Sequence, residues 1–228
     1  MTEPRVLVIG ARKGSLGQLV ADELVLKHEV VTYTAGITTE PIHLDASDYY
    51  SALERFNSIE PTHILCTVGL NQGGPFYESD WCGVAQDLME ANYLSPMKLL
   101  AAFEAYLSGM PGTFVGISSN SAHIARSSSA AYCASKAALS MGLRCAARDV
   151  SRVGKPLKIW GYELGAMVGT PMTKEVRTRL GKDVPMSRQL TDPAGMPTAA
   201  VARVVARDLL DASPVLHGCM VRLDNGEQ

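Results

Sequence analysis

The sequence lacks the features that mark membrane, secreted and nucleic-acid-binding proteins. It has no apolar run of membrane-spanning length and no block of Lys or Arg, and its formal net charge is −2. The N-terminal MTEPRVLVIG has no basic segment followed by an apolar stretch and a small-residue cleavage site, so we expect no signal peptide. These absences favour a cytoplasmic protein that binds neither a membrane nor nucleic acid.

Cysteine and histidine are sparse and scattered. The five cysteines show no C-x-x-C spacing, which is typical of reduced thiols rather than of a disulfide framework or a zinc site. The five histidines are equally dispersed, and no H-x-x-x-H occurs. We therefore expect no metal site.

What is present suits one globular domain. The 228 residues are 46% hydrophobic and 19% charged, which is ordinary for a chain that buries a sizeable core. No internal repeat, low-complexity tract or linker interrupts it, so residues 1–228 are predicted to form a single domain.

Predicted strands and helices alternate along the chain. Apolar, β-branched runs predict strands at 5–10, 29–34, 41–45, 63–69, 114–118, 158–162 and 218–224. Helical patterns cover 16–27, 49–56, 81–107, 130–150 and 198–211, and Asn92 and Pro96 interrupt the third of these. This alternation predicts an α/β fold, a Rossmann-like doubly wound parallel sheet with helices on both faces and a ligand at the carboxyl ends of the strands.

Three polar side chains meet around the strand at 114–118. Tyr132 and Lys136 stand four residues apart near the start of a helix, so they project from one face, and Ser119 ends the preceding strand. A free phenol has a pKa near ~10, and a neighbouring ammonium is expected to lower it. The phenol would then exchange a proton with a substrate oxygen that the serine holds. A solvated helix turn is the alternative interpretation of Tyr-x-x-x-Lys alone.

These residues resemble a known family. The ISS at 117–119, the YCASKAAL at 132–139 and the thirteen-residue spacing between Ser119 and Tyr132 are similar to the short-chain dehydrogenase/reductase family. The resemblance implies that Ser119, Tyr132 and Lys136 are catalytic. It also implies that Asn92, in a loose E-x-N-x-x-x-P match, holds a water that relays protons to the lysine; an exposed residue is the alternative.

A glycine loop follows the first predicted strand. Gly10, Gly14 and Gly17 separate that strand from a helix, a unit that cradles dinucleotide phosphates. The family usually reads G-x-x-x-G-x-G, whereas this chain reads G-x-x-x-G-x-x-G. Either Gly14 or Ser15 would fill the middle position. The loop residues expected to bind cofactor are Gly10, Arg12, Lys13, Ser15, Leu16 and Gly17.

The preferred cofactor is expected to be NADP(H) rather than NAD(H). NAD-preferring enzymes usually carry Asp or Glu at the end of the second strand, and none occurs here before Glu40. Arg12 and Lys13 stand in the glycine loop, where they would pair with a 2′-phosphate. Solvated loop charges are the alternative.

The resemblance implies further cofactor contacts, each with a structural alternative. Asp45 ends the third predicted strand, where the family uses an Asp to contact the adenine, and Ala46 follows it; Asp45 would also cap a helix. The family usually has Asn-Asn-Ala-Gly after the fourth strand, and this chain has Cys66, Thr67, Val68 and Gly69 there. Only Gly69 matches, and it would contact the cofactor. Beyond the sixth strand, Val168 and Thr170 would contact the nicotinamide side, although Thr170 would also cap a helix.

A flap and an oligomer complete these expectations. Residues 171–197 are rich in proline and methionine and resemble the segment that closes over substrate in the family. The small-residue face of the helix at 130–150 would pair with a second copy, giving a homodimer or homotetramer; burial within one chain explains it equally well. This face comprises Ala134, Ala137, Ala138, Met141 and Ala146.

The function predicted from the sequence is an NADP(H)-dependent oxidoreductase that interconverts a small-molecule carbonyl and an alcohol by hydride transfer. Two alternatives stay open. One is a non-catalytic NADP(H)-binding sensor or assembly protein, which the altered cofactor loops favour. The other is reduction of an activated carbon–carbon double bond. The substrate itself is left open, because the family's pockets lie in variable loops.

Overall fold

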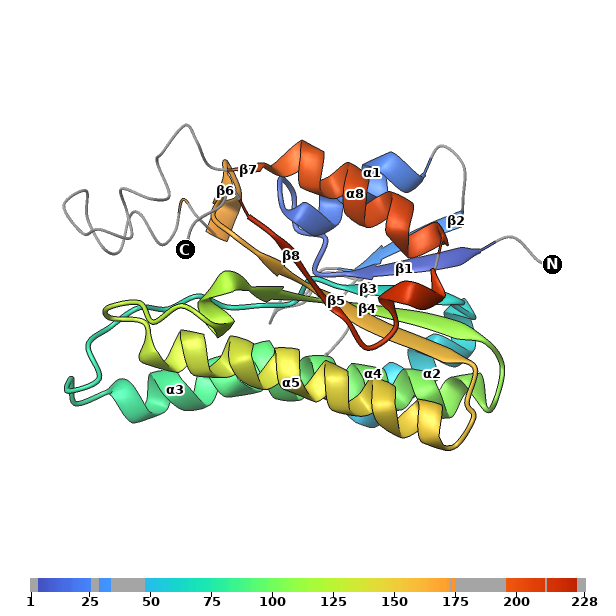
Figure 1. Ribbon diagram of the computed structural model, residues 1–228, viewed down its shortest axis with the longest axis horizontal. Helices are drawn as coiled ribbons and strands as arrows, with labels where there is room; N and C mark the ends of the chain where they lie inside the picture. Colours follow the sequence, from blue (N-terminus) through green and yellow to red (C-terminus); the bar gives the residue numbers. More distant parts are fainter. Residues whose placement is uncertain are drawn as a thin grey trace.

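A six-stranded parallel sheet organises the chain (Figure 1). The computed structural model describes residues 4–25, 29–33, 48–172, 174, 196–211 and 213–224. Neighbouring strands of the sheet follow the order β2-β1-β3-β4-β5-β8, and every pair is parallel. The strands are β1 (Arg5–Ile9), β2 (Glu29–Tyr33), β3 (His63–Cys66), β4 (Gly112–Ser119), β5 (Leu157–Leu164) and β8 (Met220–Leu223). The strand predicted at 41–45 lies outside the described residues.

Helices cover both faces of the sheet, as Figure 1 shows. One face carries α1 (Leu16–Leu24) and α8 (Thr198–Asp211). The other carries α2 (Tyr49–Ile59), α3 (Trp81–Met89), α4 (Ser95–Leu107) and α5 (Ala130–Arg152). A two-stranded parallel sheet pairs β6 (Met167–Val168) with β7 (Met196–Pro197). The predicted doubly wound α/β fold is therefore confirmed.

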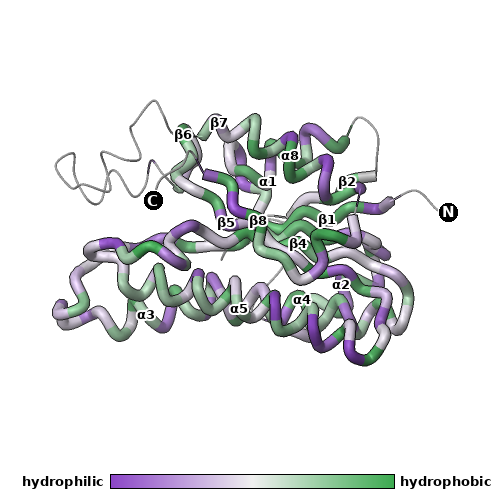
Figure 2. The backbone as a smooth tube through the Cα atoms, in the orientation of Figure 1, coloured by the Kyte–Doolittle hydropathy of each residue, from purple (hydrophilic) through white to green (hydrophobic). Residues whose placement is uncertain are grey.

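The strands are apolar on both sides because both sides are buried. Along β1, Leu7 and Ile9 join the core beneath α2, α4 and α5, whereas Val6 and Val8 join the core beneath α1 and α8. Figure 2 shows this apolar interior as the green central strands between more polar helices. Successive side chains of a strand point to opposite faces of the sheet, and here both faces are apolar. The strands therefore appear in the sequence as continuous hydrophobic runs.

Helix α5 lies close to the sheet because two strand positions lack side chains. Gly116 of β4 and Gly161 of β5 are partners in the sheet register, and Leu143 of α5 lies over both. A Cβ would stand 2.7 Å from Leu143 Cδ1 at Gly116 and 3.0 Å from it at Gly161. A side chain at either position would therefore force the Leu143 side chain to move.

The long helical pattern at 81–107 is interrupted where the sequence predicts it. A π-helical turn, η1 (Glu90–Leu94), separates α3 from α4, and Pro96 lies in the first turn of α4. Proline is tolerated there because the first N–H groups of a helix have no intrahelical partner. Single π-turns often occur at functional sites. This one carries Asn92.

Candidate active site

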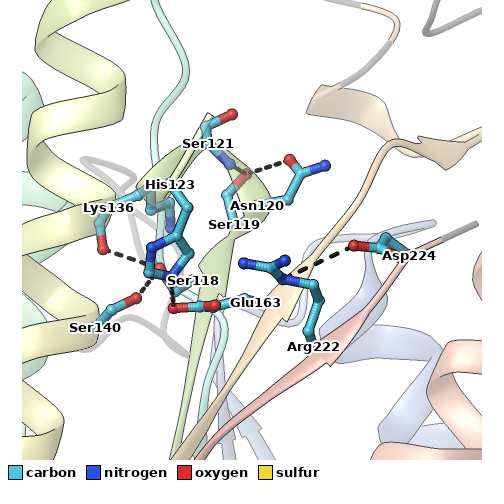
Figure 3. A network of polar contacts seen from close by, with 10 residues as sticks. All are labelled: Ser118, Ser119, Asn120, Ser121, His123, Lys136, Ser140, Glu163, Arg222 and Asp224. Carbon is cyan, nitrogen blue, oxygen red and sulfur yellow. Dashed lines mark hydrogen bonds and ion pairs between the residues drawn. The ribbon is translucent and has the colours of Figure 1, made fainter. Parts of the chain in front are cut away.

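The two serines at the end of β4 have different surroundings. Ser118 is 3% exposed; its hydroxyl donates to the Lys136 carbonyl at 2.9 Å and accepts from the Ser140 hydroxyl at 2.9 Å (Figure 3). Ser119 Oγ accepts the Ser121 N–H at 3.2 Å and starts the short helix η2 (Asn120–Ala122). Ser118 thus ties the strand to α5, and Ser119 is the serine at the site.

The structure brings Tyr132 and Lys136 together with Ser119. Both residues lie in the first two turns of α5, where Tyr132 is 8% exposed and Lys136 is 4% exposed. The Ser119 hydroxyl is close enough to the Tyr132 phenol to act on its pKa. Lys136 Nζ lies 6.0 Å from the centre of the tyrosine ring and donates to the Ile117 carbonyl at 3.1 Å. The three side chains predicted to be catalytic therefore share one buried site.

The pKa values of this site differ from the sequence expectation. Burial raises the pKa of Tyr132 above its ordinary value, although the Ser119 hydroxyl and the charge of Arg126 act in the opposite direction. Burial also lowers the pKa of Lys136 to about 8. The expectation that the ammonium makes the phenol acidic is wrong for the chain by itself, because loss of water disfavours the charged form of both groups.

Asn92 is buried rather than exposed. It is 0% exposed, and its Oδ1 accepts the Leu70 N–H at 2.6 Å. Its Nδ2 donates to the Leu70 carbonyl at 2.8 Å and to the Ser135 hydroxyl at 2.9 Å. A Cβ at Gly69 would lie 3.2 Å from Lys136 Nζ and 3.3 Å from Asn92 Oδ1. Asn92 therefore holds the loop after β3 against the lysine, and the exposed alternative is wrong.

The glycine loop after β1 packs against the end of β3. Gly10 has φ +97°, and a Cβ there would lie 2.6 Å from Thr67 Oγ1; a Cβ at Gly17 would lie 2.7 Å from the same atom. The Thr67 hydroxyl is also within hydrogen-bonding distance of the carbonyls of Ile9 and Gly10, at 3.1 and 3.0 Å. The family's asparagine is absent at this strand end, and a threonine hydroxyl joins the two strands instead.

Gly14 and Ser15, the two candidates for the middle position of the glycine loop, have different roles. Gly14 takes a left-handed conformation with φ +77°, whereas Ser15 is the N-cap of α1 and accepts the Gln18 N–H at 3.3 Å. Arg12 and Lys13 are exposed. Leu16 is 5% exposed within the core under α1, so any contact it makes with a cofactor would come from its backbone.

The remaining predicted cofactor contacts lie at three places. Asp45 and Ala46 fall outside the described residues; the N-cap of α2 is Asp48, which accepts the Tyr50 N–H, so the capping alternative for Asp45 is wrong. Val168 is 42% exposed on β6. Thr170 is 5% exposed, and its carbonyl accepts the Lys174 N–H at 3.2 Å.

Four polar residues beside Ser119 were not found from the sequence: Asn120, His123, Arg126 and Glu163. Glu163 of β5 is 3% exposed, and its Oε1 lies 2.8 Å from His123 Nε2 (Figure 3). Arg126 donates from Nη2 to Asn120 Oδ1 at 3.1 Å. No sequence motif marks Glu163 on β5 or the other three residues in the loop before α5. Only their position between Ser119 and Tyr132 could have drawn attention to Asn120, His123 and Arg126.

Among the described residues, no group of three His, Cys, Asp or Glu side chains is placed to hold a metal ion. Within the same ranges, no helix has both the length and the apolar character needed to cross a membrane.

Comparison with known proteins identifies the family. The family model described as short chain dehydrogenase matches residues 49–181. The chain belongs to the short-chain dehydrogenase family. It is therefore an enzyme, an oxidoreductase whose family binds a nicotinamide cofactor. No curated protein matches the chain significantly in sequence.

Solved short-chain dehydrogenase structures share this fold. A short-chain dehydrogenase/reductase from Saccharomyces cerevisiae is 20% identical with a TM-score of 0.82, covering 98% of this chain and 96% of its own. Thermoplasma acidophilum aldohexose dehydrogenase is 19% identical with a TM-score of 0.79, covering 98% and 94%. A Burkholderia cenocepacia short chain dehydrogenase in complex with NADP is 19% identical with a TM-score of 0.70, covering 96% and 88%. At these identities the likeness concerns the fold.

Proposed function

We propose that this enzyme uses NADP(H) to interconvert a carbonyl and an alcohol, with Tyr132 as the general acid and base. The observation that carries the proposal is the convergence of Ser119, at the end of β4, with the buried side chains of Tyr132 and Lys136 on the first two turns of α5. Two hydroxyls that converge at the carboxyl end of a parallel sheet form a site for one substrate oxygen.

The glycine loop fits the phosphates of a dinucleotide. Gly10 and Gly17 have no side chain where Thr67 comes close, and Ser15 caps a nine-residue helix whose first N–H groups have no intrahelical partner. The charges of Arg12 and Lys13 favour NADP(H) over NAD(H). The other residues proposed to contact the cofactor are Leu16, Asp45, Ala46, Gly69, Tyr132, Lys136, Val168 and Thr170.

In the proposed reaction the bound cofactor supplies or accepts the hydride, and the protein handles the proton. Ser119 holds and polarises the substrate oxygen. During reduction Tyr132 donates its proton to that oxygen, and during oxidation it accepts the proton. The raised pKa of the free phenol keeps Tyr132 protonated at neutral pH, which is the form that carbonyl reduction needs.

Lys136 and Asn92 are proposed to return the proton to solvent. An amine with a pKa of about 8 exchanges protons readily near neutral pH. Both amide hydrogens of Asn92 are already donated, so a relay water would bind at its oxygen atoms rather than at its nitrogen. The same hydrogen bonds keep Gly69 against Lys136 Nζ, which makes Asn92 a positioning residue as well.

The decisive experiment measures NADPH oxidation with a panel of ketones, aldehydes and activated alkenes. We expect turnover of carbonyl compounds by the wild type, and a fall in kcat of about 10²- to 10⁴-fold in Tyr132→Phe with unchanged NADPH binding. Tyr106→Phe, on α4 and remote from Ser119, is the matched control and should retain activity. Full activity in Tyr132→Phe would remove the mechanism. Turnover of alkenes alone would support the double-bond alternative, and binding without turnover would support a sensor.

We also propose a cytoplasmic homodimer or homotetramer that pairs through α3, α4 and α5. Met141 of α5 is 55% exposed, and Leu94 at the junction with α4 is 41% exposed. Ala134 is also exposed, so burial within one chain does not explain this face at Ala134 and Met141. Light scattering after size-exclusion chromatography tests this: a Met141→Glu variant should shift to a smaller mass, whereas a wild-type monomer would contradict the proposal.

A further inference from the structure

The residue after Ser119 carries a buried donor that the protein does not use. Asn120 is 2% exposed, and its Oδ1 accepts from Arg126 Nη2 at 3.1 Å and lies 3.5 Å from Ser119 Oγ. Its Nδ2 is buried and has no hydrogen-bond partner among the described residues. A buried polar atom without a partner destabilises a fold, so each such atom calls for an explanation, for example a ligand or a water that binds it.

Arg126 fixes which end of the amide is unused. A guanidinium only donates, so the oxygen of Asn120 must face it and the nitrogen must face the other way. Arg126 is itself anchored, because its Nε donates to Ser121 Oγ at 3.1 Å. Figure 3 shows the Asn120 amide beside Ser119, with its nitrogen directed away from the serine hydroxyl. The orientation of this donor is therefore built into the loop.

The donor lies next to the point where the proposed reaction occurs. Asn120 Oδ1 lies 3.5 Å from Ser119 Oγ, so the amide is within reach of a substrate whose reacting oxygen the serine holds. The Arg126 guanidinium is close enough to Tyr132 to act against the rise in the pKa of the phenol, so it belongs to the same site. Its positive charge would also stabilise a negatively charged oxygen there.

We infer that the Asn120 amide binds a second substrate oxygen beside the one held by Ser119, with Arg126 as the residue that positions it. This inference rests on the proposed function and narrows its substrate class. The substrates would be carbonyl compounds with a second oxygen on the neighbouring carbon, and the products would be the corresponding hydroxy compounds. The second oxygen is a carbonyl or hydroxyl if the amide alone recognises it, and a carboxylate if the charge of Arg126 contributes.

The test compares selectivity rather than activity alone. NADPH oxidation is measured with 2,3-butanedione, 3-hydroxy-2-butanone and 2-oxobutanoate, which carry the second oxygen, and with 2-butanone, which does not. We expect Asn120→Leu to lower kcat/KM about 10- to 100-fold for substrates with the second oxygen, and less than about threefold for 2-butanone. Asn120→Asp keeps the size and removes the N–H donor, so it should give the same selective loss with the neutral substrates even if Asn120→Leu folds poorly.

Positioning by Arg126 has its own signature. Arg126→Met frees the amide to rotate, so we expect a selective loss smaller than that of Asn120→Leu. A further loss with 2-oxobutanoate in this variant would assign the second oxygen to a carboxylate. Asn57→Leu, an exposed asparagine on α2, is the matched control and should keep both the selectivity and the melting temperature.

The outcomes separate this inference from the function on which it rests. Equal losses with 2-butanone and the two-oxygen substrates in both Asn120 variants would assign Asn120 a structural role and overturn the inference, while leaving carbonyl reduction intact. A wild type that binds NADPH but turns over neither these four compounds nor any other ketone or aldehyde of the panel would overturn the inference together with the proposed function, whereas turnover of other carbonyl compounds alone would overturn only the inference. Selective loss with unchanged NADPH binding supports it.

Discussion

The catalytic end and the cofactor end of the site are built in different ways. At the catalytic end, Ser119, Tyr132 and Lys136 come from one strand and the helix that follows it, and the Ser118–Lys136 hydrogen bond joins the two. At the cofactor end, the glycine loop after β1 depends on Thr67, which lies more than fifty residues further along the chain. The catalytic end is local in sequence and keeps the family's motif. The cofactor end tolerates a different glycine motif because the hydroxyl of the distant Thr67 joins β1 to the end of β3.

The largest effect should distinguish the two neighbouring serines at the catalytic end. Ser119→Ala removes the hydroxyl proposed to hold the substrate oxygen, so we expect kcat to fall about 10²- to 10³-fold with NADPH binding unchanged. Ser118→Ala breaks the link to α5 and should lower the melting temperature more than it lowers kcat. Steady-state kinetics and thermal melting check both; the reverse pattern would place the wrong serine in the site.

A smaller effect is expected from crowding the cofactor end. Gly17→Ala would place a Cβ 2.7 Å from Thr67 Oγ1, so we expect NADPH to bind about 10- to 100-fold more weakly. Alanine favours helix over glycine by about 1 kcal/mol, so helix propensity would act in the opposite direction. Fluorescence titration measures the affinity.

Two variants make that experiment specific. Gly83→Ala on α3 introduces a Cβ with nothing within 4 Å and should bind NADPH like the wild type. Adding Thr67→Ala to Gly17→Ala removes the crowded hydroxyl and should recover part of the lost affinity. If the double variant binds no better, the close contact with Thr67 is not what makes glycine necessary at this position.

Asn92 links the two ends of the site, because its hydrogen bonds with Leu70 and Ser135 form a clamp that holds the loop after β3. Asn92→Leu leaves the Leu70 N–H and carbonyl without their partner, which should cost about 1–3 kcal/mol of unfolding free energy. Ser135→Ala removes only one of the three hydrogen bonds and should cost about 1 kcal/mol. Urea unfolding gives both values. Equal stabilities would mean that the loop does not need the clamp.

The smallest effect concerns the charge of Lys136. Because burial lowers its pKa to about 8 from an ordinary value of 10.5, the unfolded chain binds more protons than the folded chain between these pH values. The contribution of Lys136 to the free energy of unfolding should therefore rise as the pH rises from about 8 to 10.5. Below pH 8 the destabilisation caused by burying the lysine charge is fully present. Lys136→Met should be more stable than the wild type by about 1–2 kcal/mol at pH 7, and this difference should shrink by pH 10. A constant difference would contradict the lowered pKa.

The sequence predicts most of the fold because the strands are short apolar runs and the helices have clear periodicity. Helix α8 occupies the predicted residues 198–211, and the interruption at Asn92 appears as the π-turn. The site is predictable where it is local: the strand end and the helix that follows fix Ser119, Tyr132 and Lys136 together.

Features that depend on distant contacts are not predictable in this way. The burial of Asn92 follows from its contact with the Leu70 backbone, and mid-helix asparagine by itself suggests exposure. The raised pKa of Tyr132 depends on how completely the folded chain excludes water, which no spacing reveals. The contact between Arg126 and Asn120 depends on how the loop folds back on itself, and the Asn and Ser residues of the loop indicate turns without showing which side chains come together.

The paired glycines beneath Leu143 have a consequence for evolution and for engineering. A methyl group at Gly116 or Gly161 would act as a wedge under α5, about three turns from Tyr132. The Leu143 side chain would have to move to make room for it. Substitutions meant to alter the substrate range are therefore best made in the loop before α5 rather than at these two strand positions.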